Sequence, residues 1–121
     1  MNIEDVKQKI SDWNAKLQTQ NPDEVVSCYS KNAILLPTLS NQVRHNHEEI
    51  RDYFVNFVAK KPQCTVEEHN VRIHDNIAIN SGVYAFTFGD GSSARGRFTF
   101  VYENVNGNLE IIEHHSSVMP E

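Results

Sequence analysis

Apolar residues recur along the chain with two different periods, and the change of period separates a helical part from a strand part. In the first segment they lie three or four positions apart, which indicates one face of a helix that runs to about Gln18. Asn2 is the expected N-cap of this helix, with Asp5 three residues further on. The apolar positions are Val6, Ile10, Trp13 and Leu17.

The four residues NPDE, at positions 21–24, are typical of a helix start. Asn21 suits the N-cap, Pro22 the first helical position and Glu24 a capping box. We expect a short helix that ends near Ser30. Its apolar positions are Val25, Val26 and Tyr29.

A short strand over residues 33–37 (AILLP), ended by Pro37, is predicted before a loop with the sequence TLSNQVRHN. Asn46 then caps a third helix, with Glu49 three residues later. Pro62, in the segment AKKPQ, prevents this helix from continuing. Its apolar positions are Ile50, Tyr53, Phe54, Phe57 and Val58.

The rest of the chain favours strands. The pattern predicts them over residues 65–73, 77–88, 95–103 and 109–118. They are separated by HDN, by the glycine-rich GDGSS and by Asn106-Gly107, which is a strong hairpin signal. The order of elements predicts an α+β fold, a cone in which three N-terminal helices pack on a strongly curved, mainly antiparallel sheet.

The hairpin at Asn106-Gly107 sets the expected register of the last two strands. It pairs Tyr102 with Ile111, Phe100 with Glu113, and Phe98 with His115. These side chains share one face, joined by Tyr84, Phe86 and Phe88 from the preceding strand. The face suits packing on the helices, and Glu113 and His115 are its polar exceptions. A slip of one residue would exchange the two faces.

The opposite face is too apolar for open solvent and has no helix to cover it. We expect a second copy of the chain to cover it, as an isologous dimer. The face carries Ile77, Ile79, Val83, Ala85, Arg97, Thr99, Val101, Ile112, His114 and Ser116. Its predicted interface residues are Val83, Arg97, Thr99, Val101, Ile112 and His114.

The length of 121 residues predicts one domain over residues 1–121. A net charge of −5 disfavours a nucleic-acid partner. The N-terminal MNIEDVKQK lacks the apolar core of a signal peptide, and no stretch has the roughly 18 apolar residues of a membrane helix. We therefore expect a cytoplasmic protein with no membrane partner.

Four stretches carry a family resemblance that covers nearly the whole chain. They are WNAKLQTQNPDEV, LPTLSNQVR, IRDYFVNFVAKKP and RFTFVYENVNGNLEIIEHHSSVMPE. The chain resembles the small bacterial proteins similar to the association domain of calcium/calmodulin-dependent protein kinase II, some labelled SgcJ/EcaC-type. These belong to the SnoaL-like, nuclear transport factor 2-like superfamily. The resemblance implies a nuclear transport factor 2-like fold and assembly into dimers or rings of dimers. It does not imply phosphoryl transfer.

The resemblance implies that the association domain of the kinase lines its cavity with basic side chains. The matching positions in this chain are apolar or uncharged. Those positions are Ile50, Tyr84, Phe100 and Ser116. Arg44, Arg95 and Arg97 could restore positive charge, but none of them matches. We expect a small apolar cavity for an unidentified small molecule, with Arg44 at its mouth. Its candidate lining residues, which are equally suited to the core, are Trp13, Tyr29, Tyr53, Tyr84, Phe98 and Phe100.

Candidate chemistry centres on Glu113 and His115, which the predicted register makes neighbours on the cavity side. A histidine and a carboxylate can act as general base and orienting group. The alternative is a hydrogen-bonded cavity wall. His114 and His115 point to opposite faces and cannot share a metal ion. His45 and His47 could chelate, but a site needs three or four convergent ligands. We predict no metal and no cofactor.

Two functions follow. The first is a non-catalytic homo-oligomerisation domain with a ligand-binding cavity. The alternative is a cofactor-independent, SnoaL-like isomerase or cyclase that uses Glu113 and His115. A calmodulin-type interface is weaker, because no basic amphipathic helix supports it. Cys28 and Cys64 have no metal-binding spacing and are expected to be free thiols.

Overall fold

The computed structural model describes residues 1–120 and has the predicted order of elements. The helices are α1 (Ile3–Gln18), α2 (Pro22–Val26) and α3 (His47–Ala59). The strands are β1 (Tyr29–Leu36), β2 (Gln63–His74), β3 (Ile77–Thr87), β4 (Ser93–Val105) and β5 (Asn108–Val118). None of the helices in this described part is long and apolar enough to cross a membrane.

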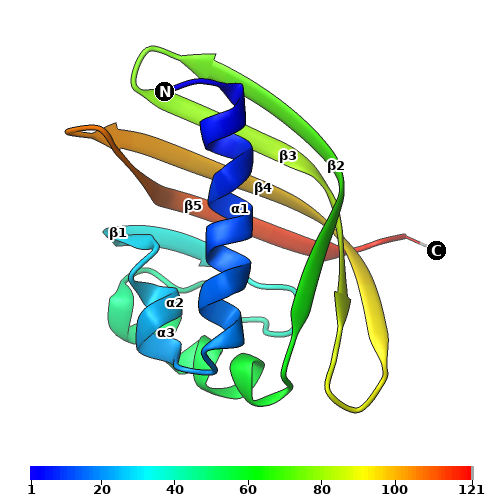
Figure 1. Ribbon diagram of the computed structural model, residues 1–121. Coiled ribbons are helices and arrows are strands. Elements are labelled where there is room, and N and C mark those ends of the chain that lie inside the picture. The colour runs from blue at the N-terminus through cyan, green and yellow to red at the C-terminus, as the bar shows by residue number, and fades with distance from the viewer. Residues whose placement is uncertain (121) are drawn as a thin grey trace.

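The five strands form one sheet in the order β1-β5-β4-β3-β2. β1 pairs with β5 in parallel, and the other pairs are antiparallel. Figure 1 shows α1 lying across the concave side of the sheet, with α2 and α3 beside its C-terminal half and below β1. The α+β cone predicted from the sequence is confirmed, and its core lies between the helices and the concave face.

The helix starts follow the capping chemistry read from the sequence. Asn2 and Asp5 form a reciprocal capping box at α1, and the Asn46 side chain accepts from the amide of Glu49 at α3. Asn21 caps α2, but Glu24 instead accepts a bond from Lys16.

α2 is shorter than predicted. The expected helix ran to about Ser30 and included Tyr29, but α2 ends at Val26 and Tyr29 begins β1. The cause is tertiary, because Tyr29 pairs with Ile111 of β5. This early start brings the Tyr29 hydroxyl into the core.

β5 contains a β-bulge. The predicted pair Tyr102–Ile111 forms, but Val101 then pairs with Glu113, so Ile112 is an extra residue on β5. A bulge adds one residue to one strand and so changes which side chains face the core beyond it.

Beyond the bulge the predicted register is wrong by one residue. The observed pairs are Phe100–His114 and Phe98–Ser116. His114 therefore faces the core, and it is 3% exposed. Glu113 and His115 lie on the outer face and are exposed. The prediction that Glu113 and His115 point inward is therefore wrong. So is the prediction that His114 and Ser116 point outward.

The remaining predicted members of the outer face do lie there. They come from β3, β4 and β5, and along β3 and β4 they alternate with buried inward residues. They are Ile77, Ile79, Val83, Ala85, Arg97, Thr99, Val101 and Ile112. Most of them are half-buried, and Arg97 is exposed.

A second bulge lies in β2, where the register shifts between Val66 and Glu68 and leaves Glu67 as the extra residue. Beside it the β2 backbone approaches Gly82 so closely that a Cβ there would lie 1.9 Å from the Glu68 carbonyl oxygen. Bulges bend a strand and increase its twist. The bulge lies in the strand pair that curls around the concave side in Figure 1.

We expect Gly82→Ala to lower the free energy of unfolding by about 1–3 kcal/mol, because the added methyl group forces β2 and β3 apart. Urea unfolding measures this. Ser81→Ala, one residue away on the half-buried outer side, is the matched control and should change stability by about 0.5 kcal/mol or less. Equal losses in both variants would contradict this account of the close approach.

Candidate functional site

A cavity of about 550 Å³ lies between α3, α1 and the curled end of the sheet. Its mouth includes the segments that follow β1, α3 and β3. This volume falls in the range of small-molecule sites. Its aromatic lining residues are Trp13, Tyr53, Phe54, Phe57, Tyr84, Phe86 and Phe88.

Of the residues predicted to line the cavity, Trp13, Tyr53 and Tyr84 do so. Tyr29, Phe98 and Phe100 do not line it but are buried behind its wall. The rings form a continuous set of contacts. Trp13 stacks on Tyr84 with centroids 6.4 Å apart, and Tyr84 contacts Phe98 at 4.8 Å. Five of the six, all except the half-buried Tyr53, belong to the buried core, so Trp13 and Tyr84 are both core residues and part of the cavity wall.

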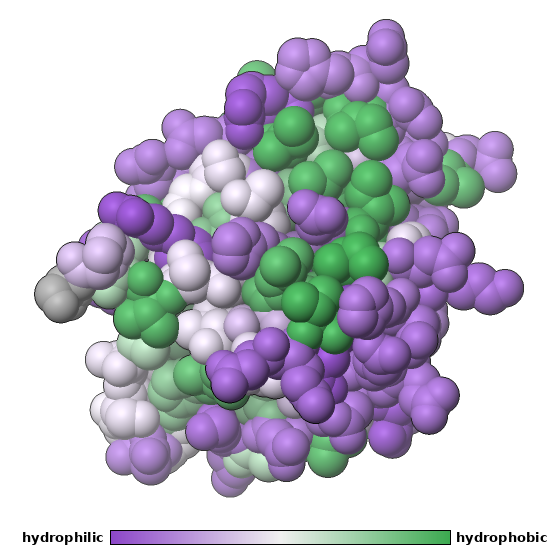
Figure 2. All heavy atoms as spheres, turned by 180° about the vertical axis from the view of Figure 1, so that it is seen from behind, coloured by the Kyte–Doolittle hydropathy of each residue, from purple (hydrophilic) through white to green (hydrophobic). Residues whose placement is uncertain are grey.

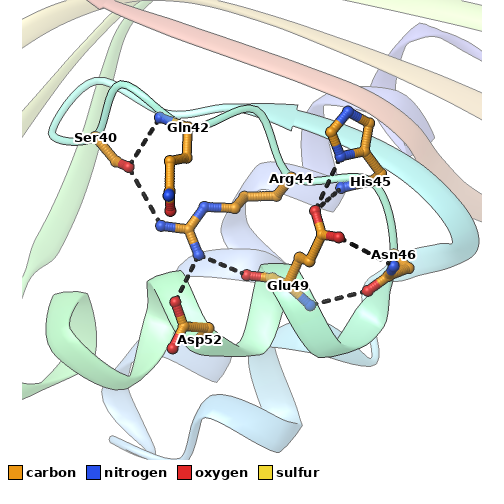
Figure 3. Close-up of polar contacts among 7 residues, drawn as sticks. All are labelled: Ser40, Gln42, Arg44, His45, Asn46, Glu49 and Asp52. Carbon is orange, nitrogen blue, oxygen red and sulfur yellow. Dashed lines mark hydrogen bonds and ion pairs between the residues drawn. The ribbon is translucent and has the colours of Figure 1, made fainter.

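Arg44 does not line the cavity, contrary to prediction. Figure 3 shows its guanidinium directed onto α3, where Nη1 donates to the Asp52 carboxylate (2.8 Å) and to the Glu49 carbonyl (2.9 Å). Nη2 donates to the Ser40 hydroxyl at 3.2 Å, and the group lies 5.8 Å from the Tyr53 ring centroid. Arg44 is 8% exposed. Its hydrogen bonds and ion pair hold loop 37–46 against α3.

His114 is the polar centre of the cavity wall. The Tyr29 hydroxyl lies 2.9 Å from its Nδ1, and the Tyr84 hydroxyl lies 3.3 Å from its Nε2. The imidazole stacks on Phe100 at 3.9 Å between centroids and meets the edge of Trp13 at 5.5 Å. These contacts tie α1, β1, β3, β4 and β5 together at one side chain.

The directions of the hydrogen bonds around His114 follow from counting donors. The Trp13 N–H donates to the Tyr29 oxygen at 3.1 Å. The Tyr29 proton then has Nδ1 as its acceptor, which places the ring proton on Nε2, facing the Tyr84 oxygen. The Tyr84 hydroxyl in turn donates to Ser116 at 2.6 Å. A chain of hydrogen bonds therefore runs from the indole to the cavity.

Burial keeps this imidazole neutral. Desolvation lowers the pKa of His114 from 6.5 to about 3, with a smaller contribution in the same direction from His115. Burial also raises the pKa of Tyr29 and of Tyr84 above the usual tyrosine value. At neutral pH the wall of the cavity therefore carries hydroxyl groups and a neutral ring, but no charge.

Charged groups lie only at the mouth of the cavity. Lys60, Lys61, Asp90 and Arg95 are exposed there. The hydroxyl and the amide N–H of Ser92 hydrogen-bond the Asp90 carboxylate and lower its pKa. Arg95 pairs with Glu67 at 2.8 Å.

The histidines considered as metal ligands have other partners. His45 bonds to Glu49 at 2.9 Å, and His47 bonds to the Tyr29 carbonyl at 2.7 Å. Over residues 1–120, no three His, Cys, Asp or Glu side chains lie close enough to hold a metal ion. Cys28 and Cys64 are free thiols, and burial raises the pKa of each.

Comparison with known proteins decides the family. The family described as the calcium/calmodulin dependent protein kinase II association domain matches residues 2–120. The chain belongs to this association-domain family. A solved structure from Xanthomonas campestris, assigned to the same domain, is 42% identical with a TM-score of 0.95. The alignment covers 100% of this chain and 90% of that one.

More distant solved structures share the fold of this association domain. An NTF2-like family protein from Streptomyces avermitilis is 12% identical with a TM-score of 0.87, covering 98% of this chain and 96% of that one. An NTF2-like superfamily protein from Salmonella enterica is 15% identical with a TM-score of 0.81, covering 98% and 91%. The association domain thus has the nuclear transport factor 2-like fold. No protein with a curated description matches it.

The four positions at which the resemblance implied a contrast with basic residues, Ile50, Tyr84, Phe100 and Ser116, divide into two groups in this association domain. Ile50 and Phe100 are fully buried and do not line the cavity. Tyr84 and Ser116 line it and are joined by a hydrogen bond. Two of the four positions therefore form the polar end of the cavity.

The buried His114 predicts an acid dependence of stability. Its folded pKa of about 3 lies below its ordinary value of 6.5, so the unfolded chain binds the proton first. The contribution of the neutral His114 to the free energy of unfolding is fully present above pH 6.5. It is lost as the pH falls from 6.5 towards 3, at about 1.4 kcal/mol per pH unit.

Urea unfolding at pH 7 and pH 5 tests this in matched variants of adjacent histidines. Wild type should lose about 2 kcal/mol more than His114→Gln between these pH values. His115→Gln, which changes an exposed outer side chain, should keep the wild-type dependence. An unchanged dependence in His114→Gln would show that folding does not shift the pKa of this imidazole.

Proposed function

We propose that this protein is a homo-oligomerisation domain that pairs through the outer face of its sheet and binds a small apolar molecule in its cavity. The observation that carries the assembly is an apolar band over the back of the sheet, which Figure 2 shows in green. Six half-buried, outward apolar side chains belong to this band: Ile34, Leu36, Ile79, Val83, Val101 and Ile112. No helix packs on this side, so a partner is needed to remove the band from water.

Two opposite charges flank the band and suit a two-fold arrangement. Arg97 on β4 and Glu113 on β5 are both exposed, and across residues 1–120 neither has an ion-pair partner. Glu113 pairs with Val101 in the sheet, and Arg97 lies four residues before Val101. In a back-to-back pair related by a two-fold axis, Arg97 of one copy would meet Glu113 of the other.

The Xanthomonas campestris relative supports the same conclusion, because its description assigns that protein to an association domain. The second copy is the economical occupant of the face, since the face itself supplies both the apolar centre and both charges. Assembly through one self-complementary surface requires no other protein.

For the cavity, binding is supported better than catalysis. A general base works best with a pKa near the operating pH. His114 is far below it, Asp90 at the mouth is shifted down, and Glu113 and His115 lie on the other side of the sheet. Two fold relatives carry proposed enzyme names, a dehydratase and an aromatic ring hydroxylase, at 12% and 17% identity. Such low identity supports the shared fold alone.

We expect Val101→Glu to convert the oligomer into monomers, because a carboxylate at the centre of the apolar band cannot be buried without a partner. Multi-angle light scattering coupled to size exclusion measures the mass. The matched control is Val55→Glu on α3, where the valine is 43% exposed and lies away from the sheet. An unchanged mass for Val101→Glu would refute the assignment of the interface.

A charge exchange tests the two-fold arrangement itself. Arg97→Glu and Glu113→Arg should each weaken the dimer, because each places like charges opposite one another. The double variant should recover at least half of the lost dimerisation free energy. Sedimentation equilibrium gives the dissociation constants, and additive losses in the double variant would contradict the pairing.

A further inference from the structure

We propose that the cavity selects an uncharged, mainly aromatic compound whose carbonyl oxygen accepts a hydrogen bond from the hydroxyl of Ser116. This inference rests on the proposed ligand-binding role of the cavity and adds the chemistry of the ligand. It depends on three features of the wall: the direction of the hydrogen bonds, the aromatic lining and the absence of internal charge.

The hydrogen bonds leave Ser116 with one unused group, and that group is a donor. A serine hydroxyl has one proton and two acceptor lone pairs. Tyr84 donates to the Ser116 oxygen at 2.6 Å, and Thr38 donates to the same oxygen at 2.6 Å. Both lone pairs are therefore occupied. The Ser116 proton has no acceptor within residues 1–120, and Ser116 itself lines the cavity.

The buried residues next to Ser116 determine the direction of these hydrogen bonds. Reversing the bond between Tyr84 and Ser116 would leave the Tyr84 proton without an acceptor, because His114 Nε2 directs its own proton at the Tyr84 oxygen. His114 is held in that tautomer by Tyr29, which accepts from Trp13. With Tyr84 and Thr38 both donating to its oxygen, Ser116 directs its own proton towards the cavity.

The remaining wall favours a flat apolar body. Phe86 contacts two other rings edge to face. Its ring centroid lies 6.2 Å from that of Trp13 and 5.5 Å from that of Phe57. Aromatic walls of this kind present ring faces and edges that pack well against another ring. These three rings and Ser116 line the same cavity.

The interior excludes a charged ligand group at Ser116. Arg44, the buried cation of this region, is turned onto Asp52 and does not line the cavity. His114 stays neutral, since desolvation lowers its pKa to about 3. An anion placed beside Ser116 would lose its hydration with no counter-ion in return. A neutral carbonyl loses much less and gains the hydrogen bond from Ser116.

Two probes of the same shape test the inference. Acetylnaphthalene carries a carbonyl oxygen, and isopropenylnaphthalene has a methylene group in its place. Calorimetric titration gives both affinities, with quenching of the single tryptophan, Trp13, as a second readout. We expect Ser116→Ala to weaken the ketone by about 3- to 10-fold and to change the hydrocarbon by less than about 2-fold. Naphthoate should bind more weakly than the ketone to wild type.

The matched control is Ser117→Ala, because Ser117 is the next residue on β5, is exposed and lies on the outer face. It should leave both affinities unchanged. Ser116→Cys is a second variant that keeps the size of the side chain but donates poorly, and it should show the same selective loss. Ser116→Thr keeps the hydroxyl and should retain the preference.

The outcomes separate this inference from the proposed function. Equal effects of Ser116→Ala on ketone and hydrocarbon, or tightest binding by naphthoate, would overturn the inference and leave a ligand-binding cavity. Failure of all three probes to bind wild type would overturn both the inference and the ligand-binding role. Assembly is measured separately by mass and would stand or fall on its own.

Discussion

The burial of one neutral imidazole is the constraint on which the rest of this structure depends. His114 is hydrogen-bonded through both ring nitrogens and stacked on Phe100, so it has the partners that a buried polar group requires. Those partners come from segments far apart in the sequence. Removing any one of them would leave a donor or acceptor unpaired in the core, which costs more than the bond itself contributes.

The bulge at Ile112 is what makes this burial possible. It places His114 inward and moves Glu113 and His115 to the outer face. The same extra residue therefore decides both sides of the sheet. On the inside it creates an uncharged polar end for the cavity. On the outside it adds a carboxylate to the rim of the apolar band, where Arg97 can pair with it across a two-fold axis.

The two proposed roles are consistent because they use opposite faces of one sheet. The cavity opens between α3 and the curled end of the sheet, whereas the band covers the back of β1, β5, β4 and β3. A ligand can therefore enter without competing with the partner copy. Arg44, expected at the cavity mouth, serves this arrangement indirectly, since it holds the loop that carries Thr38 and Leu39 to the mouth.

The sequence by itself determined the family, the order of helices and strands, and the helix starts, because periodicity and capping are local properties. It also offered Trp13, Tyr53 and Tyr84 as candidates for the cavity wall, in which the structure places them. It could not determine which of His114 and His115 is buried. Ile111-Ile112 and His114-His115 are repeated pairs, so either register gives the strand nearly the same pattern. Only the tertiary structure decided this, because β5 must pair with β4 on one side and β1 on the other while Tyr29 and Tyr84 supply partners for a single imidazole.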